Sequence, residues 1–249
     1  MPKKSITAAA VAQSALQRLA AIADAEKARQ VQKYFKESIK SFGVSSPEVR
    51  ALAKELHGLI KTEWDVREAI RLCDRLFPRP ELEAKGVAAL ILARWHKSFP
   101  RSLFKTVRGW LARNYLDNWA SVDIFCPRVL GELLAKYPEL FVEIEKWADE
   151  PNRWVKRASI VAFLKLVKDD EYLNAAYAMA ARHFACPDDL VQKANGWLLR
   201  EAGKRDPERL EKFLLANGEN MPRTTLRYAI ERFPEKKRKR LLWQTRARQ

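Results

Sequence analysis

The chain has 249 residues, of which 47% are hydrophobic and 10% aromatic, a composition typical of a globular protein and not of a disordered one. Lys and Arg total 47 against 31 Asp and Glu, so the formal net charge is +16. Such a charge predicts a polyanionic partner, with nucleic acid the leading candidate. The longest clearly apolar run, residues 87–93, is far too short to span a bilayer, and we expect no membrane partner.

The start of the chain superficially resembles a signal peptide, because Lys3 and Lys4 precede a run of alanines. Polar residues between positions 13 and 18 interrupt any hydrophobic region, so we predict an amphipathic first helix there. Cys73, Cys126 and Cys186 are far apart, odd in number and without CxxC spacing, which argues against a disulfide framework or a zinc site. This pattern fits a reducing compartment, and we predict a cytoplasmic protein.

Helix is predicted along the whole chain. Only 8 glycines occur, alternating apolar and polar residues are hard to find, and apolar residues recur with i, i+3, i+4, i+7 spacing. Prolines fall where helices should begin or turns should lie, at Pro47, Pro80, Pro100, Pro138, Pro151, Pro187, Pro207 and Pro222.

Pairing these short helices reveals a repeat. The second helix of each pair is predicted to start near Pro47, Glu81, Asn118, Asn152, Asp188 and Pro222, so that consecutive starts are 34 to 37 residues apart. A period in this range with two helices per repeat is typical of an α-solenoid, in which each pair buries its apolar face only by stacking on its neighbours. We therefore predict an all-α solenoid of about six helical pairs, with residues 1–234 as a single domain and 235–249 as a basic tail.

Basic residues recur on the predicted second helices, which would line the concave surface of such a stack. They are Arg50 and Lys54, Lys85 and Arg94, Arg128, Lys156 and Arg157, Lys193 and Arg200, and Arg223 and Arg227. Any single one is explained by solubility, but recurrence in every repeat favours a groove for a phosphate backbone. The tail, which carries Lys236 to Arg240 and also Arg246 and Arg248, is compatible both with a solvated, frayed end and with a contact to DNA.

Two of the predicted second helices place aromatic and charged side chains together. Trp119 and Asp123 are four positions apart, so they share one helical face with about 6 Å of rise between them. Lys193, Trp197 and Arg200 follow i, i+4, i+7 spacing, which displays an indole between two cations, a combination typical of nucleic-acid binding. The alternatives are that Trp197 belongs to the core and that Asp123 caps a helix or pairs with Arg157.

The sequence around these residues resembles that of a known family. Residues 118–123 read NWASVD, residues 154–158 read WVKRA, and residues 192–201 read QKANGWLLRE. Upstream, FGV at 42–44 precedes SPE at 46–48 and then Arg50. In this order the segments resemble the motifs of AlkD-type DNA alkylpurine glycosylases, and the resemblance runs from about Tyr34 to Phe233.

The resemblance implies a HEAT-like solenoid that holds duplex DNA in its concave groove. It implies excision of positively charged N3- and N7-alkylated purines in base excision repair, without flipping of the base. By position, Asp123 matches the catalytic carboxylate, Trp119 and Trp197 the two indoles that face the lesion's sugar and backbone, and Arg157 the arginine beside them. Ser46 and Arg50 match phosphate contacts. One departure is Ala120, where the family commonly has an acidic residue, which puts support of the site in doubt.

The expected DNA-binding set therefore consists of Ser46, Arg50, Lys156, Arg157, Lys193, Arg200 and Arg227. No metal or cofactor is expected, because the three histidines lack metal-ligand spacing and neither a Gly-rich phosphate loop nor a GxSxG motif is present. We expect a monomer that acts on double-stranded DNA containing alkylated bases. Two alternatives stay open: a non-catalytic binder of distorted or branched DNA, and a helical-repeat scaffold for a protein partner.

Overall fold

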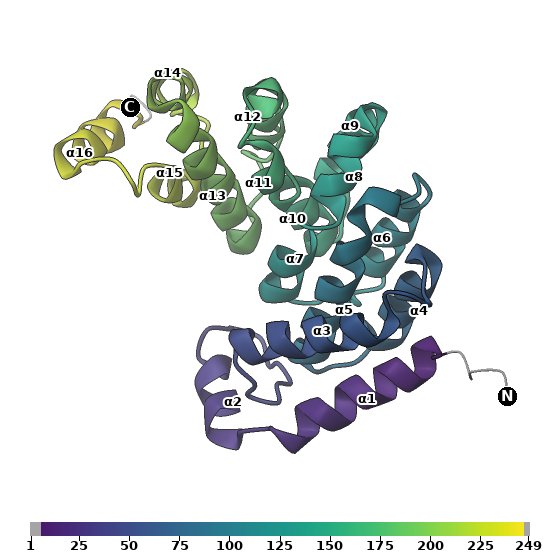
Figure 1. The fold of residues 1–249 in the computed structure, drawn as a ribbon. Coiled ribbons are helices and arrows are strands. Elements are labelled where there is room, and N and C mark those ends of the chain that lie inside the picture. The colour runs from purple at the N-terminus through teal and green to yellow at the C-terminus, as the bar shows by residue number, and fades with distance from the viewer. Residues whose placement is uncertain (1–5, 247–249) are drawn as a thin grey trace, which may run out of the picture. The chain divides into compact units, whose positions relative to one another are not determined.

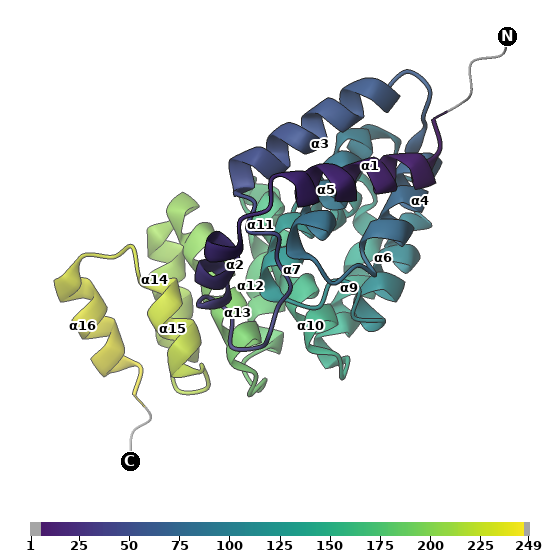
Figure 2. The same cartoon turned by 90° about the horizontal axis from the view of Figure 1, so that it is seen from below.

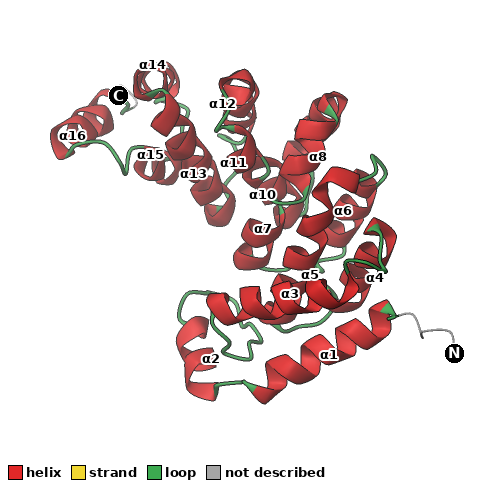
Figure 3. Ribbon diagram, in the orientation of Figure 1, coloured by secondary structure: helices red, strands yellow, loops and turns green. Residues whose placement is uncertain are grey.

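The computed structural model describes residues 6–246 as helices joined by loops and turns, with no strand in that range (Figures 1 and 3). Lys3 and Lys4 at the start and Arg248 of the basic tail lie outside the described residues. Contacts divide the chain into two compact units, the first ending at Val129 and the second beginning at Leu130. The prediction of one domain over residues 1–234 stays a prediction. Between residues 6 and 246, no helix is long and apolar enough to cross a membrane.

Unit 1 stacks helical pairs around a core of aliphatic and aromatic side chains. The predicted first helix is present as α1, whose apolar face packs on α3, α4 and α5. The second view shows α1 lying along α3 and α5 (Figure 2). The helices of this unit are α1 (Ala8–Ala21), α2 (Ala25–Gln32), α3 (Ser46–Ile60), α4 (Val66–Leu76), α5 (Leu82–Leu92), α6 (Leu103–Ala112) and α7 (Trp119–Phe125), with a 3-10 segment at Ala93–Ser98.

In unit 2 the longest helix is α13, which has 17 residues and packs against α10, α12, α14 and α15. Its helices are α8 (Leu130–Lys136), α9 (Phe141–Glu145), α10 (Arg153–Val161), α11 (Phe163–Leu166), α12 (Leu173–Arg182), α13 (Asp189–Arg205), α14 (Pro207–Asn217), α15 (Arg223–Ala229) and α16 (Glu235–Gln244). Three 3-10 segments, Pro138–Leu140, Lys146–Asp149 and Asp170–Tyr172, join or extend them.

The predicted starts of the second helices are confirmed in all six repeats. Five of the predicted residues are the N-caps of α5, α7, α10, α13 and α15, and Pro47 lies in the first turn of α3. The side chains of Asn118, Asn152 and Asp188 each accept hydrogen bonds from backbone N–H groups of the first turn. The N–H groups of a helix's first turn have no acceptor within the helix. A short polar side chain at the N-cap supplies one, and this fixes the residue at which the helix begins.

Polar bonds between neighbouring repeats recur at a spacing of about one repeat. The Trp110 indole donates to Asp74, 36 residues earlier, and the Thr225 hydroxyl donates to the carbonyl of Gln192, 33 residues earlier. Lys85 and Asp117 are 32 residues apart. The stack is therefore held by equivalent positions of adjacent repeats, as expected for nearest-neighbour packing.

The basic tail is helical over Glu235–Gln244. Leu241 of α16 is fully buried, and Lys237 and Arg240 both form ion pairs with Glu211 of α14. Arg223 donates to the carbonyl groups of Leu242 and Thr245 at the other end of the helix. The described part of the tail is thus docked on unit 2, and the frayed end considered from the sequence is not found over these residues.

Candidate functional site

The helix that carries Trp119 and Asp123 is only seven residues long and is fixed at its start. The Asn118 side-chain oxygen accepts from the backbone N–H of Ser121 at 2.9 Å, and the Ser121 hydroxyl donates to the Asn118 carbonyl at 2.9 Å. Val122 on the same helix is fully buried, whereas Trp119 and Asp123 are half-buried. A helix this short has little stability of its own, so the cap and the core contacts determine where these two side chains lie.

An ion pair between the buried Lys85 and the exposed Asp117 continues this network into the preceding repeat. Lys85 of α5 is 2% exposed, and its Nζ lies 2.5 Å from Oδ1 of Asp117, which also accepts from Nδ2 of Asn118 at 3.0 Å. The prediction that Lys85 lines the DNA groove is therefore wrong. α5 is buried on nearly all sides, and Lys85 is used inside the stack to fix the residues that begin α7.

Trp119 and Asp123 line a pocket that is formed within unit 1. Its volume is about 350 Å³, and most of its wall is apolar, contributed by α2, α3, α5, α7 and the loop before α3. The predicted site residues that line it are Ser46, Arg50, Trp119 and Asp123, and Ala120 lies beside them. The structure thus brings together four of the residues chosen from the sequence. A small apolar pocket with a few converging polar groups is the usual form of a ligand site.

The indole of Trp119 is stacked on the ring of Phe35. The ring centroids are 4.9 Å apart and the planes differ by 18°, which is a stacked geometry. Phe35 is itself buried, whereas its neighbour Tyr34 is 77% exposed at the edge of the same pocket. One face of the Trp119 indole is therefore covered, and a ligand has access only to its other face or its edge.

The start of α3 supplies the cationic side of the pocket. Glu48 accepts from both the N–H and the hydroxyl of Ser45, bonds that lower the pKa of Glu48 and hold the first turn in place. Ser46 and Arg50, one turn apart, are both exposed. Partial burial and then the charge of Arg50 lower the pKa of Arg128. Two guanidinium groups close enough to repel each other favour a bound anion, such as a phosphate.

The loop before α3 is tied to α5 by a buried carboxylate. Glu83, 5% exposed, accepts from the hydroxyl of Ser41 at 2.6 Å and from the N–H groups of Phe42 and Val44 at 2.9 and 3.1 Å. Gly43 in this loop has φ of +73°, and a Cβ there would lie 2.0 Å from a backbone oxygen of Asp24. The FGV segment is therefore a tight turn that only glycine permits, and it places α3 against the pocket.

In unit 2, the residues around Trp197 anchor α13 to its neighbours. Nδ2 of the buried Asn195 donates to the Ala180 carbonyl of α12 at 2.9 Å. Gly196 faces α15 so closely that a Cβ would lie 2.4 Å from Cβ of Tyr228. Trp197, the next residue, is half-buried. Asn195 and Gly196 thus fix α13 against its neighbours, while part of the Trp197 indole surface stays exposed.

The predicted DNA-binding cations of unit 2 differ in their surroundings. Arg157 is 5% exposed and donates to the carbonyl of Leu190, so it joins α10 to α13. Lys193 pairs with Asp189 at 2.8 Å, and Arg200 pairs with Glu231. Lys156 is half-buried and Arg227 is exposed. A role in DNA binding stays a prediction for all five, and for Arg157 the structure adds a bond between helices.

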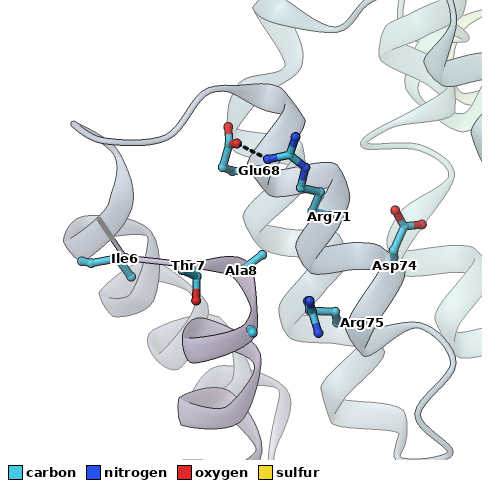
Figure 4. A pocket seen from close by; sticks show the side chains of 8 residues that line it. Ile6, Thr7, Ala8, Glu68, Arg71, Asp74 and Arg75 are labelled. Carbon is cyan, nitrogen blue, oxygen red and sulfur yellow. Dashed lines mark hydrogen bonds and ion pairs between the residues drawn. The ribbon is translucent and has the colours of Figure 1, made fainter. Parts of the chain in front are cut away.

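A second hollow of unit 1 contains none of the predicted residues. It has a volume of about 410 Å³ and lies between the start of α1 and α4, where Arg71 is turned toward Glu68 and Arg75 lies opposite Ala8 (Figure 4). Arg71 pairs with Glu68 at 2.6 Å, and Asp74 accepts from the Trp110 indole at 2.7 Å. These charged groups bond to each other and to the core, so this hollow is not the candidate site.

Several residues that shape the site were not found from the sequence. Phe35, Glu83 and the pair of Lys85 and Asp117 act through contacts with residues 32 to 84 positions away. A partial signal was present, because Asp117 directly precedes the quoted NWASVD segment and FGV directly precedes α3.

Comparison with known proteins gives a consistent result. The family described as DNA alkylation repair enzyme matches residues 15–233. Among solved structures, the chain is similar to one described as a predicted DNA alkylation repair enzyme from Enterococcus faecalis. The TM-score is 0.72 with 19% sequence identity, over 86% of this chain and 97% of that chain, which confirms the predicted all-helical repeat fold. No curated protein matches the chain.

Proposed function

Because the chain belongs to the DNA alkylation repair enzyme family, we propose that it is a DNA glycosylase that removes positively charged N3- and N7-alkylated purines from duplex DNA. The observation that carries the proposal is the pocket of unit 1, in which Trp119 and Asp123 project from one helix beside Ser46 and Arg50. The cationic start of α3 suits a phosphate, and the carboxylate suits a developing positive charge.

The chemistry needs few groups, because alkylation has already made the purine a cation and a good leaving group. The bond between C1′ of the sugar and the purine nitrogen breaks, and its electron pair neutralises the departing base. The sugar is left as an oxocarbenium ion. Asp123 stabilises this cation electrostatically, orients the water that attacks C1′, and accepts the proton that the water loses.

The aromatic residues add a smaller contribution. The accessible face or edge of Trp119 attracts the sugar cation, an interaction of about 1 kcal/mol that rises with desolvation. We assign Trp197 a contact with the DNA backbone, and Arg157, Lys156, Lys193, Arg200 and Arg227 contacts with phosphates. Excision without base flipping belongs to the same proposal. The protein should then remove bulky cationic adducts in addition to methylated bases.

The test is single-turnover release of 3-methyladenine and 7-methylguanine from methylated duplex DNA. Asp123→Asn keeps the shape of the side chain and removes its charge. Release should fall by at least a hundredfold, as for loss of one preorganised electrostatic group, while binding to the same duplex persists. Asp170→Asn is the matched control, since Asp170 is exposed, pairs with Arg205 and lies outside the pocket.

The outcomes separate the proposal from its main alternative. If the unaltered protein releases no base but binds distorted or branched duplexes, the chain is a non-catalytic DNA binder. Equal release by the unaltered protein and Asp123→Asn would remove Asp123 from the mechanism. Binding that does not weaken as salt rises would contradict a phosphate-binding surface altogether.

A further inference from the structure

The basic helix α16 presents an exposed tryptophan surrounded by cations. Trp243 is 70% exposed, whereas a large indole is ordinarily buried. Lys236 and Lys239 precede it by seven and four residues, which places the three side chains on one face of the helix. The match to the family ends at residue 233, so this helix lies outside the matched region.

The opposite face of α16 is fully used for docking. Leu241 is buried, Glu211 of α14 pairs with Lys237 and Arg240, and Figure 1 shows α16 beside α14 in unit 2. The exposed position of Trp243 is therefore not the result of a detached helix. The helix is held with its indole toward solvent.

The positive charge on this helix is only partly neutralised. Residues 235–246 contain six Lys and Arg residues and one Glu. Lys239 pairs with Glu235 at 2.7 Å, but both side chains are at least two-thirds exposed. The pair therefore contributes little to stability, and a more highly charged anion can displace Glu235 from Lys239. Burial and then the charges of Arg227 and Arg246 lower the pKa of Arg223, which lies at the base of the helix. Like charges gathered in this way favour a polyanion as the partner.

We propose that the face of α16 formed by Lys236, Lys239 and Trp243 binds unpaired DNA, with the two lysines on the phosphates and the indole stacked on an exposed base. Phosphate contacts from cations alone are sufficient to bind a duplex, because its bases are stacked inside. Stacking on an indole requires a base whose face is exposed, and surfaces that bind single strands combine aromatic and basic side chains. An anionic membrane fits less well, because such helices bury a broad apolar face in the lipid and the apolar face of α16 is occupied by α14.

The test uses the full chain and a fluorescein-labelled single-stranded 12-mer without lesions, with binding followed by anisotropy. Trp243→Ala should weaken binding about tenfold, the effect of losing one stacked base, and Trp243→Phe should restore most of it. The double variant Lys236→Gln/Lys239→Gln should reduce the slope of log affinity against log salt by about 1.4, from two phosphate contacts on a single strand.

Matched controls lie elsewhere on the surface. Val142→Ala removes another exposed apolar side chain of unit 2, and Lys61→Gln/Lys105→Gln makes the same change of charge on unit 1. Both should bind the 12-mer as the parent does. A blunt duplex of the same sequence should be bound equally by the parent and Trp243→Ala.

Three results would overturn the inference. The first is a Trp243→Ala variant that binds the 12-mer within twofold of the parent, and the second is an equal loss in the controls or on the blunt duplex. The third is binding to phosphatidylserine vesicles that depends on Trp243 while the 12-mer is not bound. Excision from methylated duplex is measured on the same variants, and because Trp243 has no part in the proposed chemistry, failure of either proposal leaves the other standing.

Discussion

Replacing Gly196 by alanine tests whether close packing of α13 on α15 positions the residues around Trp197. A Cβ at position 196 would lie 2.4 Å from Cβ of Tyr228 and 2.5 Å from the carbonyl oxygen of Thr225. Neither atom can rotate away, because one is backbone and the other is attached directly to it. The two helices must therefore move apart to accommodate one methyl group.

The magnitude follows from two opposing effects. Alanine in a helix interior is favoured over glycine by about 1 kcal/mol. Forcing an extra methyl group into a packed interface costs about 1–3 kcal/mol, and contacts with backbone place this case at the upper end. Gly196→Ala should therefore lower the free energy of unfolding by about 1–2 kcal/mol.

Gly58→Ala is the matched control, because Gly58 is also inside a helix but a Cβ there meets nothing within 4 Å. This variant should gain up to about 1 kcal/mol from helix propensity alone. Urea unfolding followed by circular dichroism measures both, and hydrogen exchange in peptides from α13 and α15 locates the change. A Gly196→Ala protein as stable as Gly58→Ala would refute the packing argument.

Three further predictions concern buried polar groups. Glu83→Gln places an amide donor against backbone N–H donors. It should lower the free energy of unfolding in urea by about 1–3 kcal/mol and slow base release. Unchanged stability and release would contradict the role given to the Glu83 carboxylate. Lys85→Met should slow base release more than it changes stability, since Lys85 holds Asp117 before α7; an unaltered rate would show that α7 is placed without it. Burial lowers the pKa of His183 to about 4, below its value of 6.5 in the unfolded chain, so its neutral form is the stable one. Stability should therefore fall as pH drops from 6.5 toward 4, by about 2 kcal/mol at pH 5, and His183→Gln should lose this part of the slope in urea unfolding at pH 7.5 and 5.

The repeat architecture could be read from the sequence because its signals are local. Pro47, Asn118 and Asp188 lie at helix starts, where a residue's own side chain or ring selects the backbone conformation. The same locality explains why Trp119 and Asp123 were correctly placed on one helix, since four residues of spacing suffice.

Burial of charged residues could not be read in this way. Lys85 and Arg157 occupy positions where the helical pattern also permits exposure, and each is buried because a partner lies 32 or 33 residues later. Only the three-dimensional stack reveals that Asp117 and the Leu190 carbonyl are within reach. The docking of the tail is a similar case, because it depends on Glu211 in the preceding helix pair.

The short length of α7 has a consequence for how such a protein can change. A helix of two turns does not set its own orientation, so the direction of Asp123 depends on Asn118, Asp117 and Lys85 in the adjoining repeat. The wall of the pocket, at Tyr34 and Ala120, takes no part in these bonds as described. Under the proposed function, the residues that shape the pocket wall therefore differ from those that orient Asp123, and selection can alter the first set while the second is retained.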